Sequence, residues 1–140
     1  MIDYTFARPT NVTDQAILDL YRSNGWTAYT EAPQNTLAAF QQSTVLWALA
    51  SGRLVGFVRG ITDGHTILYI QDILVHPDFQ RQHIGTALVR RYLQRHQHIG
   101  QTVLITDDER RTRAFYQSIG FSEVRPQDDG RAFVLDRRFN

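Results

Sequence analysis

The alternation of apolar and polar positions in the first half of the chain predicts one strand, two helices and a three-stranded meander. Residues 2–6 alternate between apolar and polar, which is typical of a half-buried strand. Apolar residues at 17, 20 and 21 follow the spacing of one helix face, and Asn24 and Gly25 are a helix stop signal. Pro33 is well placed in the first turn of a second helix. Three apolar runs separated by short turns then predict antiparallel strands over residues 45–50, 54–61 and 66–75.

In the second half the pattern changes to alternating helices and strands. From about Ile84, apolar residues recur at i+4 steps and arginines cover the opposite face, as expected for an amphipathic helix. Residues 102–105 form a short apolar run, so strand, helix and strand make a crossover unit that should be parallel and right-handed. A further helix has apolar residues on one face up to Ile119, and Gly120 is a typical C-terminal cap. The last apolar runs predict a final pair of strands over residues 121–124 and 132–135.

The resulting order of elements is β-α-α-β-β-β-α-β-α-β-β. It predicts an α/β fold of the α+β type, with a mixed and mostly antiparallel central sheet and helices on both of its faces. A chain of 140 residues has the usual size of one domain, and no linker or repeat interrupts it. We therefore expect a single domain over residues 1–140.

Composition excludes several kinds of chemistry. The chain has no cysteine, which excludes disulfides, thiolate metal ligands and a cysteine nucleophile. It also has no lysine, which excludes Schiff-base chemistry and a lysine-type phosphate loop. No apolar run approaches the roughly 18 residues that span a bilayer, and the N-terminus lacks the pattern of a secretory signal. We expect a cytoplasmic protein that has no membrane partner.

Charge is distributed unevenly although the net charge is only +1. Residues 1–80 carry four arginines and seven acidic residues, whereas residues 81–140 carry eleven arginines and seven acidic residues. The basic second half suggests an anionic ligand. A nucleic-acid binder is the alternative, but the low net charge and the lack of a nucleic-acid motif argue against it. His96 and His98 resemble a metal pair, yet no third ligand is implied, so we expect no metal.

The segment from Asp72 to Val89 is the most informative part of the sequence. A strand ends there, a turn follows, and a helix begins beside Gly85. Unpaired amides at a helix start and the helix dipole favour an anion such as a pyrophosphate. Gly85 lets a ligand approach the backbone, and Arg81 adds a positive charge. An ordinary strand–loop–helix connection that binds nothing is the alternative.

Two motifs in this half resemble those of a known family. The segment starting at Gln80 resembles motif A of the GNAT superfamily of acetyl-CoA-dependent N-acetyltransferases, which reads Arg or Gln, two residues, Gly, one residue, then Gly or Ala. Gln80 and Gly85 match this motif, whereas His83 stands at its first glycine. Downstream, the segment from Phe115 to Phe121 resembles the family's Phe-Tyr-x-x-x-Gly-Phe segment. The predicted order of elements also matches a GNAT domain.

The resemblance implies that acetyl-CoA is the cosubstrate. Backbone groups near Leu74 and Val75 should pair with its pantetheine arm, and Tyr116 should lie near the thioester sulfur as a candidate general acid. Glu109 departs from the family, which often has Asn seven residues before the tyrosine. The pyrophosphate should lie against a continuous stretch made of Gln80, Arg81, Gln82, His83, Ile84, Gly85 and Thr86.

The implied activity is transfer of an acetyl group from acetyl-CoA to a primary amine of a small molecule, peptide or protein. Asp72 is a candidate base or acceptor-binding residue; alternatively, it is a structural carboxylate held by an arginine or by backbone amides. Gln71 and Tyr69 face the other way by period-two counting and could also line a cleft. Glu31 is a further candidate base. The alternative function is a non-catalytic sensor of CoA or acyl-CoA. Homodimers are common in the family.

Overall fold

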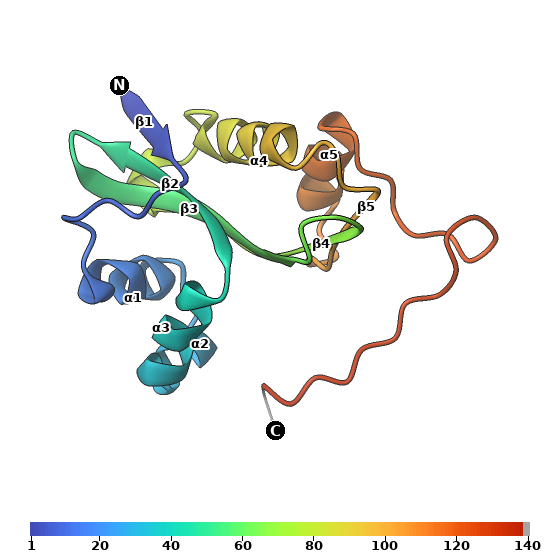
Figure 1. Cartoon of the computed structure of the whole chain (residues 1–140), viewed down its shortest axis with the longest axis horizontal. Coiled ribbons are helices and arrows are strands. Elements are labelled where there is room, and N and C mark those ends of the chain that lie inside the picture. Colours follow the sequence, from blue (N-terminus) through green and yellow to red (C-terminus); the bar gives the residue numbers. More distant parts are fainter. Residues whose placement is uncertain (139–140) are drawn as a thin grey trace. The chain divides into compact units, whose positions relative to one another are not determined.

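The computed structural model of the protein describes residues 1–138, which form two compact units. The first unit is Met1–Ile105 and the second begins at Thr106 (Figure 1). The single domain expected over residues 1–140 stays a prediction. None of the helices in the described part of the chain is long and apolar enough to cross a membrane.

The first unit contains five strands, four α-helices and one short 3₁₀ turn within residues 1–105. Its strands are β1 (Ile2–Thr5), β2 (Thr44–Ala50), β3 (Arg53–Thr62), β4 (Ile67–Val75) and β5 (Gln101–Leu104). Its helices are α1 (Asp14–Ser23), α2 (Ala28–Glu31), α3 (Pro33–Gln41) and α4 (Ile84–Arg95), with the 3₁₀ turn η1 (Pro77–Phe79) before α4. The short helix α2 lies in a stretch for which the polarity pattern predicts no element.

The strands form one sheet in the order β1-β2-β3-β4-β5. All neighbouring pairs are antiparallel except β4 and β5, which are parallel and joined through α4. Helices α1 and α3 lie on one face of this sheet and α4 lies on the other (Figure 1). The predicted mixed, mostly antiparallel sheet with helices on both faces is therefore confirmed.

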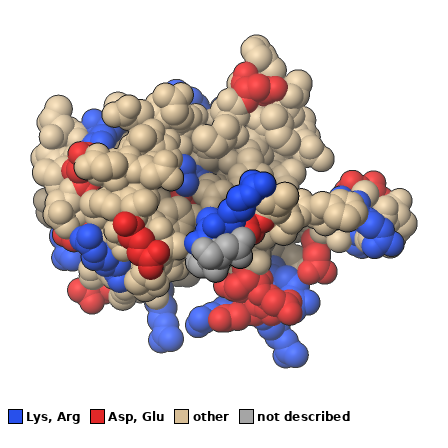
Figure 2. Space-filling view, turned by 90° about the horizontal axis from the view of Figure 1, so that it is seen from below, with Lys and Arg blue, Asp and Glu red and all other residues tan. Residues whose placement is uncertain are grey.

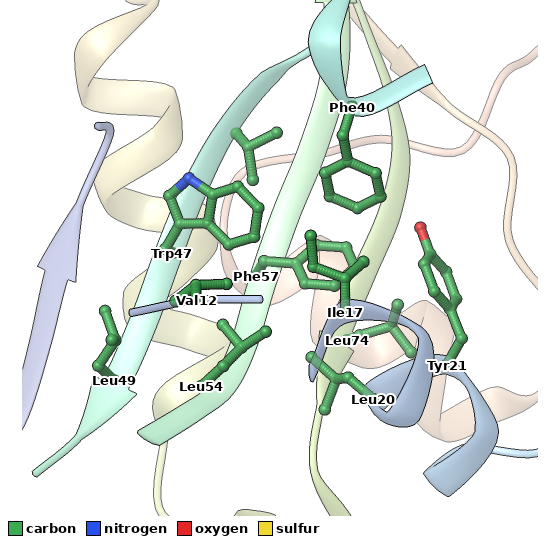
Figure 3. Packing of buried hydrophobic residues seen from close by; sticks show 11 residues of the cluster. Val12, Ile17, Leu20, Tyr21, Phe40, Trp47, Leu49, Leu54, Phe57 and Leu74 are labelled. Atoms are coloured by element: carbon green, nitrogen blue, oxygen red, sulfur yellow. The ribbon is translucent and has the colours of Figure 1, made fainter. Parts of the chain in front are cut away.

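The larger core lies between the sheet and helices α1 and α3. Four aromatic side chains pack there among seven aliphatic ones, and Figure 3 shows these four, Tyr21, Phe40, Trp47 and Phe57. On the other face, two positions of β3 have no room for a side chain, because atoms of α4 or β4 lie too close. A Cβ at Gly60 would lie 2.6 Å from the Tyr92 hydroxyl oxygen, and one at Gly56 would lie 2.7 Å from a β4 carbonyl oxygen.

The second unit contains one helix, α5 (Arg110–Ser118), and Gly120 follows it with φ 103°, as expected for a C-terminal cap. The predicted strands over residues 121–124 and 132–135 are wrong, because residues 121–138 form no strand. Phe133 is 91% exposed and Val134 is 72% exposed. A strand requires a neighbour for its backbone hydrogen bonds, and an apolar run alone does not show whether a neighbour exists.

Candidate functional site

Strand β4 extends beyond the end of its shorter neighbour β5. The two strands pair only from Ile67 with Gln101 to Ile70 with Leu104, where β5 ends. Residues 71–75 of β4 continue beside β3 alone, and within residues 1–138 no strand pairs with their other edge. An unpaired strand edge offers backbone N–H and C=O groups to an extended ligand that carries amides.

Alternation along β4 shows which backbone groups face this open edge. The amide of His76 donates to a carbonyl oxygen of β3 at 2.8 Å, so Leu74, two residues earlier, also turns its backbone toward β3. The backbone groups of Ile73 and Val75 therefore face the open edge. The Val75 carbonyl oxygen accepts a hydrogen bond from the Gln80 side chain at 3.2 Å. Of the two residues expected to pair with the pantetheine arm, Val75 has its backbone groups at the open edge. The backbone groups of Leu74 face β3, and its side chain is buried in the core.

The loop after β4 carries two non-glycine residues in the left-handed backbone region. Arg81 has φ 64° and His83 has φ 63°. His83 immediately precedes α4, and its side chain makes no capping hydrogen bond to the helix. Glycine adopts this conformation at lower cost than any residue with a Cβ. The departure at His83 therefore leaves the backbone in a conformation that suits glycine.

The start of α4 can hold an anion. The first N–H groups of a helix have no acceptor inside it, and the helix dipole favours negative charge there. A Cβ at Gly85 would contact only Val75 Cγ2, at 3.9 Å, so the first turn of α4 lies beside the open end of β4. The seven residues expected around a pyrophosphate run from the end of η1 into the first turn of α4: Gln80, Arg81, Gln82, His83, Ile84, Gly85 and Thr86. Their contact with a pyrophosphate stays a prediction.

A buried carboxylate lies within β4, beside an irregularity in its pairing with β3. Asp72 is 1% exposed. Its Oδ2 accepts hydrogen bonds from the Tyr21 hydroxyl at 2.7 Å and from Arg59 Nε at 2.9 Å. Its Oδ1 accepts from the Tyr29 hydroxyl at 2.8 Å. Burial raises the pKa of the Tyr21 hydroxyl, and the carboxylate of Asp72 raises it further, so the phenol stays protonated.

Arg59 balances the charge of this carboxylate. The guanidinium is buried, donates to the Ser43 hydroxyl at 3.0 Å and lies over the ring of Phe40. Burial is the largest influence and disfavours its charge, but Asp72 and Tyr21 together outweigh it, so the pKa of Arg59 is raised. Asp72 thus matches the structural alternative, a carboxylate held by an arginine. With 1% of its surface exposed, Asp72 presents almost no surface to an amine.

A β-bulge brings a second side chain to the same cluster. Arg59 pairs with Asp72 and Gly60 with Ile70, so Gln71 is an extra residue on β4. Its Nε2 donates to the Tyr29 hydroxyl at 3.0 Å. Period-two counting places Gln71 on the opposite face from Asp72, and this prediction is wrong because the bulge breaks the alternation.

Three members of the cluster are missing from the residues that the sequence singles out: Tyr21, Arg59 and Ser43. A charged residue inside the apolar run of residues 54–61 is the signal that could have indicated Arg59 as the partner of a buried acid. Glu31, a weaker candidate base, is exposed at the end of α2. Tyr69 is half-buried on β4.

Tyr116 belongs to the second unit. It lies on α5, half-buried, with its ring against those of Phe115 and Phe121. Burial raises the pKa of Tyr116, and a hydrogen bond with Thr106 opposes this rise. The hydroxyl is therefore protonated at neutral pH, as a proton donor must be. The role of Tyr116 at the thioester stays a prediction.

Charges on α5 are largely balanced by neighbours in sequence. Arg111 pairs with Glu109 at 3.6 Å, and Arg113 pairs with Asp108 at 3.4 Å. Figure 2 shows acidic and basic side chains interspersed on the face that it displays. Among residues 1–138 there is also no group of three His, Cys, Asp or Glu side chains that could hold a metal ion.

Comparison with known proteins identifies the family. The family model described as the acetyltransferase (GNAT) family matches residues 14–121. The chain belongs to this family. A GNAT family acetyltransferase from Streptococcus pneumoniae is 28% identical, with a TM-score of 0.79 over 98% of this chain and 99% of its own.

Two further similar proteins, both named N-acetyltransferases, extend the comparison. The PaiA N-acetyltransferase of Thermoplasma acidophilum, solved in complex with coenzyme A, is 16% identical and shares the fold, with a TM-score of 0.70 over 93% of this chain and 94% of its own. An uncharacterized N-acetyltransferase, ycf52, from Pyropia yezoensis is 27% identical over 59% of this chain. The match spans about half of that relative, 51% of its length.

Proposed function

We propose that this GNAT protein transfers an acetyl group from acetyl-CoA to a primary amine of a small molecule, peptide or protein. The observation that carries the proposal is the junction of the open β4 edge with the start of α4. The β4 edge offers a row of backbone amide groups, and the start of α4 offers unpaired helix N–H groups and the positive end of the helix dipole. A pantetheine arm joined to a pyrophosphate has the complementary order of groups.

The residues fit acetyl-CoA as follows. The backbone groups of Ile73 and Val75 would pair with the pantetheine amides. The helix start at Ile84 and Gly85 would receive the pyrophosphate, with Arg81 supplying a guanidinium that suits phosphate. The Thermoplasma protein, which shares the fold, was solved in complex with coenzyme A, and this supports coenzyme A as the kind of ligand.

The reaction requires a neutral amine and a departing thiolate. The amine lone pair forms the new bond to the thioester carbon as the carbon–sulfur bond breaks. A lysine-like amine has a pKa of about 10.4, so deprotonation at pH 7 costs about 4–5 kcal/mol. Since Asp72 is sequestered, solvent is the proposed recipient of the amine proton. The Tyr116 hydroxyl is the proposed donor to the thiolate.

An experiment on thiol release tests this function. Because the chain has no cysteine, a thiol-reactive dye detects only the CoA that is released. The purified protein is incubated with acetyl-CoA and a panel of amines, and release is compared with amine-free controls. Amine-dependent release supports the transferase. Tight binding of CoA without release under any condition would instead indicate the sensor function.

A further inference from the structure

The hydroxyl of Tyr29 has spare capacity for one hydrogen bond. A phenol supplies one donor and two acceptor positions. Its single proton goes to Asp72 Oδ1 at 2.8 Å, and one acceptor position is taken by Gln71 Nε2 at 3.0 Å. One acceptor position remains, and the ring is only half-buried.

The single proton of the Tyr29 hydroxyl also fixes the orientation of the Gln71 carboxamide. Because the only proton of the Tyr29 hydroxyl is committed to Asp72, Gln71 must present its NH₂ group to Tyr29. Its carbonyl oxygen is left as an acceptor that no donor of residues 1–138 engages. Two acceptors, one on each side chain, thus lie together where β4 leaves β5.

This pair of acceptors carries little net charge. The charge of Asp72 is offset by Arg59 at 2.9 Å, and both side chains are buried behind Tyr29. A ligand at the pair would therefore meet neutral oxygen acceptors rather than an open carboxylate. Such a site recognises an N–H donor but gives no particular advantage to a molecule with several positive charges.

An aromatic surface borders the same hydroxyl. Trp26 is 38% exposed and stacks on the Tyr29 ring at 5.9 Å between centroids. The Tyr29 ring also stacks on the buried ring of Tyr21, with 4.5 Å between their centroids. An exposed indole beside hydrogen-bond acceptors suits a ligand with an apolar or aromatic body next to its polar end.

We propose that Tyr29 and Gln71 bind the amine of the acetyl acceptor and that Trp26 packs against its apolar body. The acceptor class is then a primary amine on an aromatic or apolar body, rather than a polyamine or an amino sugar. This inference rests on the proposed function, since it names the acceptor for that same reaction.

Binding of phenethylamine tests the inference, with spermidine as the polycationic comparison. The change in tryptophan fluorescence is followed in the presence of saturating CoA, and the Trp26→Phe variant identifies the reporting residue, because Trp47 is buried. Tyr29→Phe removes the hydroxyl acceptor and should weaken phenethylamine about 2- to 10-fold. Gln71→Leu should weaken it similarly.

Tyr21→Phe is the matched control. It removes a hydrogen bond of the same kind to the same carboxylate, but from the buried side. It should leave phenethylamine affinity unchanged, and melting curves establish that each variant is folded. Equal weakening by Tyr21→Phe and Tyr29→Phe would overturn the inference, because the effect would then act through Asp72.

The remaining outcomes separate the two proposals. If CoA binds but millimolar phenethylamine does not, or if spermidine binds more tightly, the acceptor class is wrong and the transferase function stands. If CoA itself does not bind, the proposed function is wrong. Phenethylamine binding that depends on Tyr29 and Gln71 supports the site.

Discussion

Replacing Asp72 with asparagine should be among the most damaging single changes to the first unit. The substitution preserves shape but removes the negative charge that Arg59 faces at 2.9 Å. The asparagine NH₂ group would also point at one of three donors, so at least one buried hydrogen bond is lost. Arg59 is 7% exposed, and its guanidinium has no other carboxylate in the cluster.

The expected loss follows from the burial of both partners. Breaking a buried ion pair by removing one partner costs about 3–5 kcal/mol. Domains of ordinary stability unfold with about 5–15 kcal/mol, so the loss is a large fraction of the total. For a chain of this size, each kcal/mol corresponds to about 3–4 °C, so the melting temperature should fall by about 10–20 °C.

Urea unfolding followed by circular dichroism measures the effect. Arg59→Met and the double variant complete a thermodynamic cycle with Asp72→Asn. The double variant should be less destabilised than the sum of the single variants, by about 1–3 kcal/mol, because neither charge is left alone. A loss below about 1 kcal/mol for Asp72→Asn, or additive single losses, would refute the role assigned to this pair.

Three further predictions concern the loop, α5 and α4. His83→Gly should leave the affinity for CoA unchanged in calorimetry. It should raise the free energy of unfolding by about 0.5–1 kcal/mol, because glycine takes φ 63° without strain. Loss of CoA binding would show instead that the imidazole contacts the ligand. Tyr116→Phe should slow acetyl transfer by up to about 10²–10⁴-fold with unchanged acetyl-CoA affinity; an unchanged rate, with chemistry limiting, leaves Tyr116 a packing residue. Burial lowers the pKa of His96, whose Nδ1 donates to the Tyr92 carbonyl at 2.8 Å. As the pH falls, the His96 imidazole therefore gains its second proton more readily in the unfolded chain than in the folded one, and the free energy of unfolding should fall below about pH 6.5. The His96→Phe variant should show a smaller slope of unfolding free energy against pH. An equal slope in both proteins would contradict this prediction.

Periodicity was sufficient to predict the sheet and the helix that follows it. The three apolar runs of the meander and the i+4 spacing after Ile84 match β2, β3, β4 and α4 closely. These elements bury one face or both, and burial leaves a repeat that can be counted along the chain. The turn that precedes the helix was predictable because a strand end followed by an amphipathic helix is itself a local pattern, whereas the site bounds Gln80 to Thr86 came from the family resemblance.

Other features depend on contacts between distant residues. The bulge at Gln71 depends on the register of β4 against β3, and the partners of Asp72 come from α1, α2 and β3. The failed strand pair shows the same limit, since residues 132–135 have the right composition but no neighbouring strand within the described chain. A local sequence pattern shows that a segment is able to form a strand, whereas pairing with a neighbouring strand decides whether it does.

Isothermal calorimetry of acetyl-CoA binding is the most direct test of the central claim. Pantetheine, which lacks the pyrophosphate, is the matched ligand. Acetyl-CoA should bind and, at 100 times its dissociation constant, stabilise the fold by about 2.7 kcal/mol. Pantetheine should bind more weakly, because it leaves the start of α4 without an anion. No heat and no melting shift with millimolar acetyl-CoA would contradict the assignment of the β4 edge and α4 as its site.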